Sequence, residues 1–266
     1  MQIILGFLLA VVVAVLAWRL TALSRSGMLA AIVTGGLIFG LGGLPWATLL
    51  LVFFVSSSVL SRAYKKRKAP LAEKFSKGGQ RDWGQVLANG GLGAILAVAG
   101  CLTHRWDCLW MAFAGAMAAV NADTWSTELG VLSLIPPRLI TTGKRVERGT
   151  SGAITFTGSL AALGGAALVA FFALLFTPGL ELLTRLLIII LAGLAGSFFD
   201  SILGATVQAI YWCPSCNKET ERYPLHACGS PTAHLRGWKW FNNDMVNFAC
   251  SLMGAIVAAG IWSILR

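Results

Sequence analysis

Apolar residues fall in long, nearly uninterrupted runs along this chain, and the charged residues gather in the shorter stretches between them. A helix of about 20 mostly apolar residues is long enough to span a bilayer. The runs therefore predict membrane helices at residues 2–20, 28–43, 45–61, 84–102, 108–122, 156–177, 183–210 and 243–264. They do not alternate with a period of two, so a membrane β-barrel is not expected. We predict an all-α fold, a polytopic integral membrane helical bundle of about eight transmembrane helices.

The composition agrees with a single membrane domain over residues 1–266. Hydrophobic residues make up 56% of the chain and charged residues 12%, about half the charged fraction of a soluble globular protein. The first run lacks a basic segment before it and a clear cleavage site, which indicates a retained helix rather than a signal peptide. Three longer polar loops separate the runs, at residues 62–83, 123–155 and 211–242.

The basic residues indicate how the bundle is oriented. All but three of the 21 Lys and Arg residues fall on one side of an eight-helix arrangement, the exceptions being Arg105, Arg185 and Arg266. Loops rich in Lys and Arg stay in the cytoplasm. We therefore expect a multi-pass cell-membrane protein with both termini outside and the three polar loops cytoplasmic. The densest basic patch, RAYKKRKAPLAEKF, is expected to meet anionic membrane lipids, with a phosphorylated substrate as the alternative. No nucleic-acid fold is recognisable, so nucleic acid is not an expected partner.

Two of the predicted helices carry polar faces. A charged group at membrane depth costs roughly 3 kcal/mol or more unless it is paired, hydrated or bound to a cation. At 100° per residue, one stripe of the seventh run contains Gly193, Ser197, Asp200, Ser201, Gly204 and Gln208. We interpret it as a cation or substrate surface rather than a structural hydrogen-bonded Asp. The eighth run opens with a similar face of Asn243, Asp244, Asn247, Ser251 and Gly254. An N-cap at Asn242 or Asn243, and a helix-dipole role for Asp244, remain open there.

The fifth run ends in NADTWSTELG, which places Asp123 and Glu128 where the helix leaves the membrane. In a regular helix these two carboxylates point about 140° apart, so they do not serve one site from a straight helix. Either the helix breaks near Thr124 or only one carboxylate contacts the ligand. We predict a break, because DTWST is poor in strong helix formers.

The loop that follows, PPRLITTGKRVERGTSGAITFTGS, is rich in glycine, hydroxyl and basic residues and leads into a helix. Backbone N–H groups, a helix N-terminus and cationic side chains are all ligands for phosphate. The loop has no Walker A sequence, and an ordinary basic turn has a similar composition. Phosphate binding and a simple topological role therefore remain open on this evidence.

A second loop, CPSCNKETERYPLHACG, indicates a zinc site in a zinc-knuckle-like segment at residues 211–236. A CxxC pair followed by an HxC pair supplies tetrahedral ligands. We predict Cys213, Cys216, His226 and Cys228 as ligands, with His234 as a substitute fourth ligand. A structural zinc is favoured over a catalytic one because four ligands close the shell, and a metal-free loop is the alternative. A disulfide is disfavoured in a cytoplasmic loop.

Five segments together carry a resemblance to a known family: NADTWSTELGVLS, PRLITTGKRVERGTSGAITFTGS, GSFFDSILGATVQ, CPSC…HACG and NNDMVNF. In order and spacing they resemble the membrane family that includes plant phytyl-phosphate kinase and transmembrane protein 19-like proteins, long catalogued as a domain of unknown function. The resemblance runs from about residue 25 to the C-terminus. It implies an isoprenoid-phosphate kinase that transfers a phosphoryl group from a nucleoside triphosphate, CTP in our prediction, to a prenyl monophosphate such as phytyl phosphate.

The resemblance also implies roles for individual residues. The candidate Mg²⁺ ligands are Asp123, Asp200 and Asp244, with Glu128 binding the ion or supporting a ligand. The residues expected to neutralise or contact phosphate are Lys144, Arg145, Arg148, Gly149, Thr150 and Gly152. The expected polar supports are Asn121, Ser201, Gln208, Asn243 and Asn247.

Three other functions fit parts of the pattern. Membrane-embedded Asp200 and Asp244 suit a cation-coupled secondary transporter, although the polar groups crowd one side of the membrane and no internal repeat is visible. A CTP-dependent lipid cytidylyltransferase would use a similar site and leave CMP on the lipid. A zinc-loop scaffold without catalysis would tolerate Asp123→Asn and Asp200→Asn.

Overall fold

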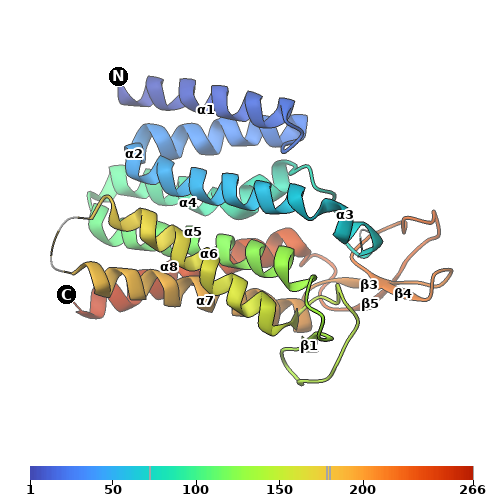
Figure 1. Cartoon of the computed structure of the whole chain (residues 1–266). Coiled ribbons are helices and arrows are strands. Elements are labelled where there is room, and N and C mark those ends of the chain that lie inside the picture. Colours follow the sequence, from blue (N-terminus) through green and yellow to red (C-terminus); the bar gives the residue numbers. More distant parts are fainter. Residues whose placement is uncertain (72, 178, 180, 266) are drawn as a thin grey trace.

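The computed structural model describes residues 1–71, 73–177, 179 and 181–265; Arg266 and one residue of the 62–83 loop, Ala72, lie outside this set. Helices dominate the described chain (Figure 1): α1 Gln2–Arg19, α2 Arg25–Ala63, α3 Lys65–Lys68, the 3-10 turn η1 Ala69–Leu71, α4 Trp83–Thr103, α5 Trp106–Gly130, α6 Phe156–Leu174, α7 Leu182–Thr206 and α8 Asn243–Leu265. The strands are short: β1 Arg138–Leu139, β2 Ala153–Ile154, β3 Ile210–Cys213, β4 Lys218–Thr220 and β5 Ala233–Arg236. The predicted all-α membrane bundle is confirmed.

Within the described residues, six helices are long and apolar enough to cross a membrane. One of them, α2, is a hairpin, because Gly43 leaves helical geometry at φ 73° and ψ −163°. The first and last turns of α2 both lie beside Arg81. A Cβ at Gly27 would lie 2.1 Å from the Arg81 carbonyl oxygen, and Ser57 and Ser58 accept hydrogen bonds from the Arg81 guanidinium. Together with α5, whose 25 residues lie in the middle of the bundle, this arrangement gives the eight predicted helical passes.

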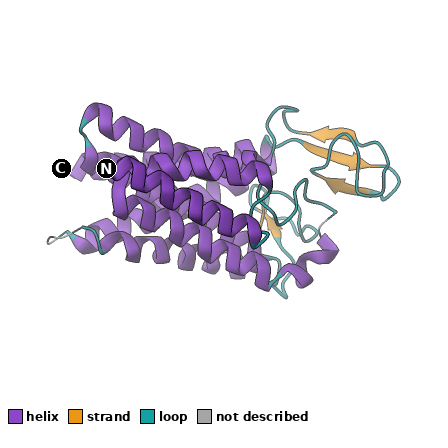
Figure 2. Ribbon diagram, turned by 90° about the horizontal axis from the view of Figure 1, so that it is seen from above, coloured by secondary structure: helices purple, strands orange, loops and turns teal. Residues whose placement is uncertain are grey.

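The eight passes alternate in direction, so the two termini lie at one end of the bundle and the polar loops at the other (Figure 1, Figure 2). We call these the terminal end and the loop end. The loop end carries residues 64–82, 131–155 and 207–242. The last two of these loops form a two-stranded sheet, β1–β2, and a three-stranded sheet in the order β4-β3-β5.

The core is built around α5, in which every residue from Trp110 to Ala122 is buried. Most of these residues are small, which lets membrane helices approach one another closely. A Cβ at Gly115 would lie 2.4 Å from the Gly254 carbonyl oxygen of α8, and a Cβ at Gly196 of α7 would lie 2.4 Å from the Ala119 Cβ. Close contact among α5, α7 and α8 brings the polar residues at their loop ends together.

The predicted break in α5 near Thr124 is wrong, because the helix continues to Gly130. The Thr124 hydroxyl donates to the carbonyl of Val120 one turn earlier, at 2.8 Å, so this weak helix former is satisfied within the helix. Asn121 and Glu128 are buried, and their packing outweighs the low helix propensity of DTWST. The seventh helix also ends earlier than predicted, at Thr206, so Gln208 lies in the loop that follows it.

Candidate functional site

Four carboxylates from four different elements approach one another at the loop end: Asp123 of α5, Asp200 of α7, Glu221 just after β4, and Asp244 of α8. We call them the acid cluster. Asp200 is within electrostatic range of Asp123 and Glu221, and Glu221 is within range of Asp244. One carboxylate oxygen each of Asp200 and Asp244 is buried without a hydrogen-bond partner in the described chain. Acids this close repel one another unless a cation or a proton neutralises them.

Lys77 is the cation that meets this cluster in the structure. Its ammonium lies 2.5 Å from Asp244 Oδ2 and 2.9 Å from Asp82, the N-cap of α4. Burial alone would lower the pKa of Lys77, but hydrogen bonds and attraction from Asp244 and Asp82 outweigh burial and raise it. The ammonium therefore stays charged and fixes α4 to α8 beside the other acids.

Glu221 is held by neighbours on two sides. Its carboxylate accepts hydrogen bonds from the Ser76 amide at 3.3 Å and from Gln208 Nε2 at 2.9 Å. Burial raises the pKa of Glu221, and these hydrogen bonds oppose that shift. The side-chain oxygen of Gln208, Oε1, in turn accepts from the Ser151 hydroxyl, so Gln208 links the acid cluster to the glycine-rich loop.

The glycine-rich loop lies beside Glu221 and lines a small pocket with it. The pocket residues come from all three loops: Lys74, Gly149, Thr150, Ser151, Ile210, Glu219, Thr220 and Glu221. The Lys74 ammonium lies 2.8 Å from Glu147 and 3.1 Å from the Arg148 carbonyl oxygen. A cationic side chain beside glycine-rich backbone is the arrangement that binds phosphate oxygens.

Gly152 fixes this loop against the end of α7. Its φ is +79°, and a Cβ there would lie 2.3 Å from the Ala205 amide nitrogen. The Arg236 guanidinium donates to the carbonyls of Gly204 and Ala205 nearby. Gly152 therefore acts through close packing of the backbone, which only glycine permits here.

We expect Gly152→Ala to lower the free energy of unfolding by about 2–5 kcal/mol, because it adds both left-handed strain and overlap with Ala205. Gly143→Ala is the matched control, since Gly143 has a φ of +68° and no atom lies within 4 Å of the place that its Cβ would occupy. That variant should lose only about 1–2 kcal/mol. Thermal unfolding of the two variants in detergent measures the difference, and equal losses would contradict this role for Gly152.

The cations predicted from the same loop are placed differently. Lys144 and Arg145 are exposed on the hairpin that joins β1 to β2, and neither side chain has a hydrogen bond or ion pair within the described chain. Arg148 is also exposed and donates to the Ser133 carbonyl oxygen at 2.6 Å. Lys74 and Lys77 were expected only as cations of the 62–83 loop, and they lie closer to the acids and the glycine-rich backbone.

Glu128 and Asn121 belong to a separate polar contact between α5 and its neighbours. Glu128 accepts from the Ser61 hydroxyl of α2 at 2.6 Å and lies in the field of Arg81. Asn121 accepts from Ser56 at 2.9 Å and donates to the Gly165 carbonyl oxygen of α6 at 2.8 Å. Because α5 is straight, these side chains point to α2 and α6 while Asp123 points towards α7.

The remaining predicted supports lie on α7 and α8. The Ser201 hydroxyl donates to the Ser197 carbonyl oxygen within α7. Asn242 caps α8, because its side-chain oxygen accepts from the amides of Asp244 and Met245 at 3.0 and 3.2 Å. Asn243 and Asn247 are half-buried in the first turns of α8, near Asp244 in the sequence.

The predicted zinc ligands form a compact cluster at one end of β3, with Cys213 in the strand and the other three in the segments that connect the strands. The ligand atoms of Cys213, Cys216, His226 and Cys228 all lie within 4.8 Å of one another. Cys213 Sγ is 3.6 Å and His226 Nδ1 is 3.2 Å from Cys228 Sγ, close to the edge of about 3.8 Å for a tetrahedron with Zn–S bonds of about 2.3 Å. The four residues can therefore hold a metal ion, and their chemistry favours zinc.

Thiol chemistry and the second histidine support this ligand set. Hydrogen bonds from Ser230 and then His226 lower the pKa of Cys228 to about 5, whereas a hydrogen bond to Cys228 raises that of Cys216 to about 11. The lowered pKa favours the thiolate form of Cys228, which is the form that binds a metal ion, and a bound cation would deprotonate the other thiols. The substitute ligand His234 lies elsewhere, with Nε2 3.0 Å from the Gly237 carbonyl oxygen. All six cysteines are free thiols.

The three-stranded sheet also holds the 73–77 segment in place. The Glu221 amide donates to the Lys74 carbonyl at 2.8 Å, the Thr220 hydroxyl donates to the Glu73 carbonyl at 3.0 Å, and Lys218 pairs with Glu73 at 2.6 Å. Glu221 thus depends on a sheet that is closed by the cysteine–histidine cluster. Glu221 was not predicted from the sequence. It is an acidic residue in a loop that was interpreted only for its metal ligands.

A bundle with six described helices long and apolar enough to cross a membrane, and with its polar loops at one end, is typical of a multi-pass integral membrane protein. The chain belongs to the family described as integral membrane protein DUF92, whose model matches residues 8–255. This agrees with the family resemblance inferred from the five motifs.

Curated relatives cover nearly the whole chain. Protein PGR of Arabidopsis thaliana is 33% identical over 97% of this chain and 95% of its own length. The uncharacterized membrane protein MJ0933 of Methanocaldococcus jannaschii is 32% identical over 78% of this chain and 84% of its own. Protein VTE6, chloroplastic, of Arabidopsis thaliana is 27% identical over 90% and 65%. No solved structure matches the chain.

Proposed function

We propose that this protein is an isoprenoid-phosphate kinase of the membrane. It transfers a phosphoryl group from a nucleoside triphosphate, CTP in our proposal, to a prenyl monophosphate such as phytyl phosphate. The observation that carries the proposal is the approach of Asp123, Asp200, Glu221 and Asp244 beside Lys77 and the glycine-rich loop. This polar site lies at the end of an apolar bundle, where a lipid phosphate has its head group in water and its chain in the membrane.

The arrangement suits phosphoryl transfer, in which positioning and charge neutralisation supply most of the catalysis. Carboxylates hold Mg²⁺ through one or two oxygens while substrate phosphates complete its shell. We assign that role to the acid cluster, and phosphate binding to Lys74 and the backbone of Gly149 and Thr150. An oxygen of the prenyl monophosphate attacks the γ-phosphorus, and the bond to the β,γ-bridging oxygen breaks. The nucleoside diphosphate leaves with that electron pair. The acceptor oxygen is already largely ionised, so no general base is required.

Two further assignments belong to this proposal. We assign the loop end, and hence the site, to the cytoplasm, because its loops are rich in Lys and Arg and the positive-inside rule supports this orientation. The Cys₃His cluster holds a structural zinc, since four protein ligands leave no open position for a reacting group. A lipid cytidylyltransferase would use the same acids, and the mass of the product distinguishes the two reactions. A transporter fits less well, because the acids gather at one end of the bundle rather than at its middle.

An assay of the purified protein with several prenyl monophosphates and all four nucleoside triphosphates tests the proposal. We expect a prenyl diphosphate as product, fastest with CTP, and a fall of about 100-fold or more when Mg²⁺ is removed. A product that carries CMP would establish the cytidylyltransferase instead. Absence of any lipid product with every nucleotide, combined with ion-driven uptake into proteoliposomes, would establish a transporter.

A further inference from the structure

Lys77 is, within the described chain, the one basic side chain at ion-pair distance of the acid cluster, and it is shared between two acids. Its ammonium lies 2.5 Å from Asp244 Oδ2 and 2.9 Å from Asp82. Asp244 belongs to the acid cluster, whereas Asp82 lies outside it as the N-cap of α4. The ammonium therefore joins one acid of the site to one acid beside the site.

This single ammonium leaves most of the acid cluster without a counter-ion. Asp244 Oδ1 and Asp200 Oδ2 are buried and have no hydrogen-bond partner among the described residues. No Lys or Arg of that part of the chain reaches Asp123, Asp200 or Glu221 at ion-pair distance. Buried carboxylate oxygens without partners are costly, and a divalent cation binds oxygens of several carboxylates at once. The acid cluster therefore fits a divalent cation better than it fits the ammonium of Lys77.

The ammonium and the Asp244 carboxylate meet in a space that α4 leaves open. A Cβ at Gly84, in the first turn of α4, would lie 2.5 Å from Asp244 Oδ2 and 3.0 Å from Lys77 Nζ. The Lys77 side chain is 30% exposed and the Asp244 side chain 18%. Because the lysine stem is long and has rotatable bonds, the ammonium can leave Asp244 on the exposed side without a change in the backbone.

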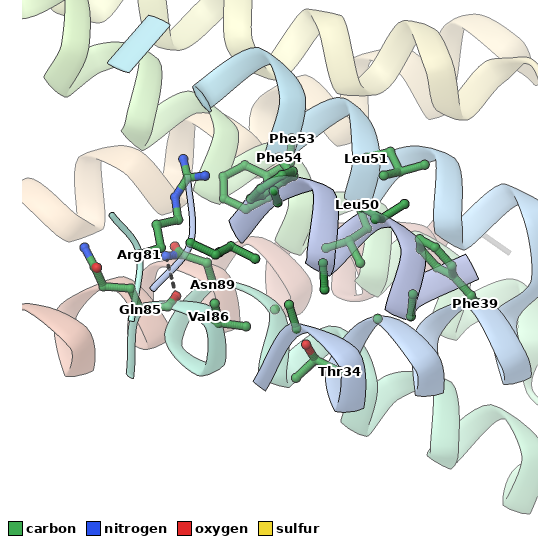
Figure 3. Close-up of a pocket in the computed structure, with 18 residues that line it drawn as sticks. Thr34, Phe39, Leu50, Leu51, Phe53, Phe54, Arg81, Gln85, Val86 and Asn89 are labelled. Carbon is green, nitrogen blue, oxygen red and sulfur yellow. Dashed lines mark hydrogen bonds between the residues drawn. The ribbon is translucent and has the colours of Figure 1, made fainter. Parts of the chain in front are cut away.

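Asp82, the second partner of the ammonium, is held firmly at the start of α4. Its carboxylate accepts from the Gln85 amide at 2.9 Å, and the Gln85 side chain accepts from the Asp82 amide at 3.2 Å. The preceding residue, Arg81, lies beside Phe53 and Phe54 (Figure 3), with its guanidinium 5.6 and 5.3 Å from their ring centroids. Asp82 is therefore a fixed partner that keeps the ammonium close to the site.

We propose that Lys77 is a tethered counter-ion of the acid cluster. It occupies Asp244 in the metal-free protein and releases this carboxylate when a divalent cation binds, while it stays paired with Asp82. The use of that cation in phosphoryl transfer rests on the proposed function, whereas the exchange at Asp244 rests on the contacts of Lys77. In the metal-free protein, the ammonium reduces the repulsion that Asp244 exerts on the neighbouring acids.

Binding of Mn²⁺ tests the exchange without nucleotide or lipid. The purified protein is titrated in detergent, and the free ion is followed by its electron paramagnetic resonance signal. Affinity is reduced by the fraction of molecules in which the site is competent to bind. We expect Lys77→Met to bind Mn²⁺ about tenfold more tightly than the wild-type protein, as for an amine docked in roughly nine-tenths of the molecules. Lys77→Gln should behave alike, and Lys77→Arg, which keeps the charge, should show no gain.

Thermal unfolding gives a readout that a purely structural lysine would not produce. Without metal, Lys77→Met should melt roughly 2–4 °C below the wild-type protein, because the acids lose their counter-ion. Saturating Mg²⁺ should remove most of this difference, since Lys77 no longer contacts Asp244 in the metal-bound wild-type protein. A lysine that only joined α4 to α8 would lower the melting temperature equally with and without Mg²⁺.

Lys74→Met is the matched control for removal of one positive charge from the same segment. The Lys74 ammonium contacts Glu147 at 2.8 Å and the Arg148 carbonyl oxygen at 3.1 Å, not an acid of the cluster. In 0.15 M salt, screening over about 8 Å weakens charges that are not in contact. We therefore expect the Mn²⁺ affinity of Lys74→Met to stay within about twofold of the wild-type value.

The outcomes separate the exchange from the kinase reaction. Tighter Mn²⁺ binding in Lys77→Met, without a lipid product from any nucleotide, would support the exchange and defeat the proposed function. Unchanged Mn²⁺ affinity in both Lys77→Met and Lys77→Gln, an equal gain in Lys74→Met, or no saturable Mn²⁺ binding would overturn the exchange, even in an active kinase.

Discussion

Asp200→Asn is expected to abolish phosphoryl transfer while making the metal-free protein more stable. We expect the rate to fall by about 1,000-fold and the melting temperature without Mg²⁺ to rise by roughly 2–4 °C, which corresponds to about 1 kcal/mol. The two effects have one cause. Asp200 is repelled by Asp123 and Glu221 when no cation is bound, and the same repulsion becomes attraction to a divalent ion held among these carboxylates.

The stability measurement makes the prediction specific to a cation site. Mg²⁺ should raise the melting temperature of the wild-type protein, because a ligand that binds only the folded state stabilises it, and it should have little effect on Asp200→Asn. An aspartate that served only as an interhelical hydrogen-bond partner would behave in the opposite way: its replacement would lower the melting temperature with and without Mg²⁺.

Glu181→Gln is the matched control for removal of one negative charge. Glu181 precedes α7 at the terminal end of the bundle, and its half-exposed carboxylate lies 3.9 Å from Arg185. We expect full activity and an unchanged response to Mg²⁺ in this variant. If Asp200→Asn retains more than about a tenth of the wild-type rate, the acid cluster is not where the metal acts.

Patterns local in sequence predicted most of the fold and part of the site. Apolar runs located the helical passes, and the boundary predicted between the runs 28–43 and 45–61 agrees with the turn at Gly43. The cysteine–histidine cluster could be predicted for the same reason, because the spacing of Cys213, Cys216, His226 and Cys228 is itself the signal. The small and polar stripe around Asp200 was interpreted as a cation or substrate surface, and that role stays a prediction.

Those patterns could not predict contacts between segments that are far apart in the sequence. Glu221 reaches the acid cluster only because β4 lies against the 73–77 segment, and Lys77 reaches Asp244 only because α4 and α8 begin side by side. In the sequence, Arg81 is one of several cations in a basic loop. Its position in the fold depends on backbone hydrogen bonds to the turn between α1 and α2. The break predicted in α5 failed because propensity was weighed without the packing of Asn121 and Glu128 against α2 and α6.

The dependence of Glu221 on the sheet beside the cysteine–histidine cluster leads to the second large effect. Cys216→Ser is expected to lower zinc content from about one ion per chain to about a tenth or less, because structural zinc contributes roughly 10 kcal/mol or more to the folding of such modules. The helical bundle should remain folded, since the sheet lies outside it (Figure 2). Activity should nevertheless fall about 100-fold, because Glu221, Lys74 and the glycine-rich loop would no longer be held together.

Three further variants distinguish the loss of the correct position of Glu221 from a general loss of folding. Cys101→Ser, which replaces an exposed cysteine of α4, should keep both zinc and activity, and His234→Ala should keep zinc because His234 lies outside the ligand cluster. Glu221→Gln should keep zinc and lose activity, which separates the metal from the carboxylate that it positions. A zinc-depleted Cys216→Ser protein with wild-type activity would show that the sheet does not hold Glu221 in the site. Loss of zinc in Glu221→Gln would instead make that carboxylate part of the metal centre.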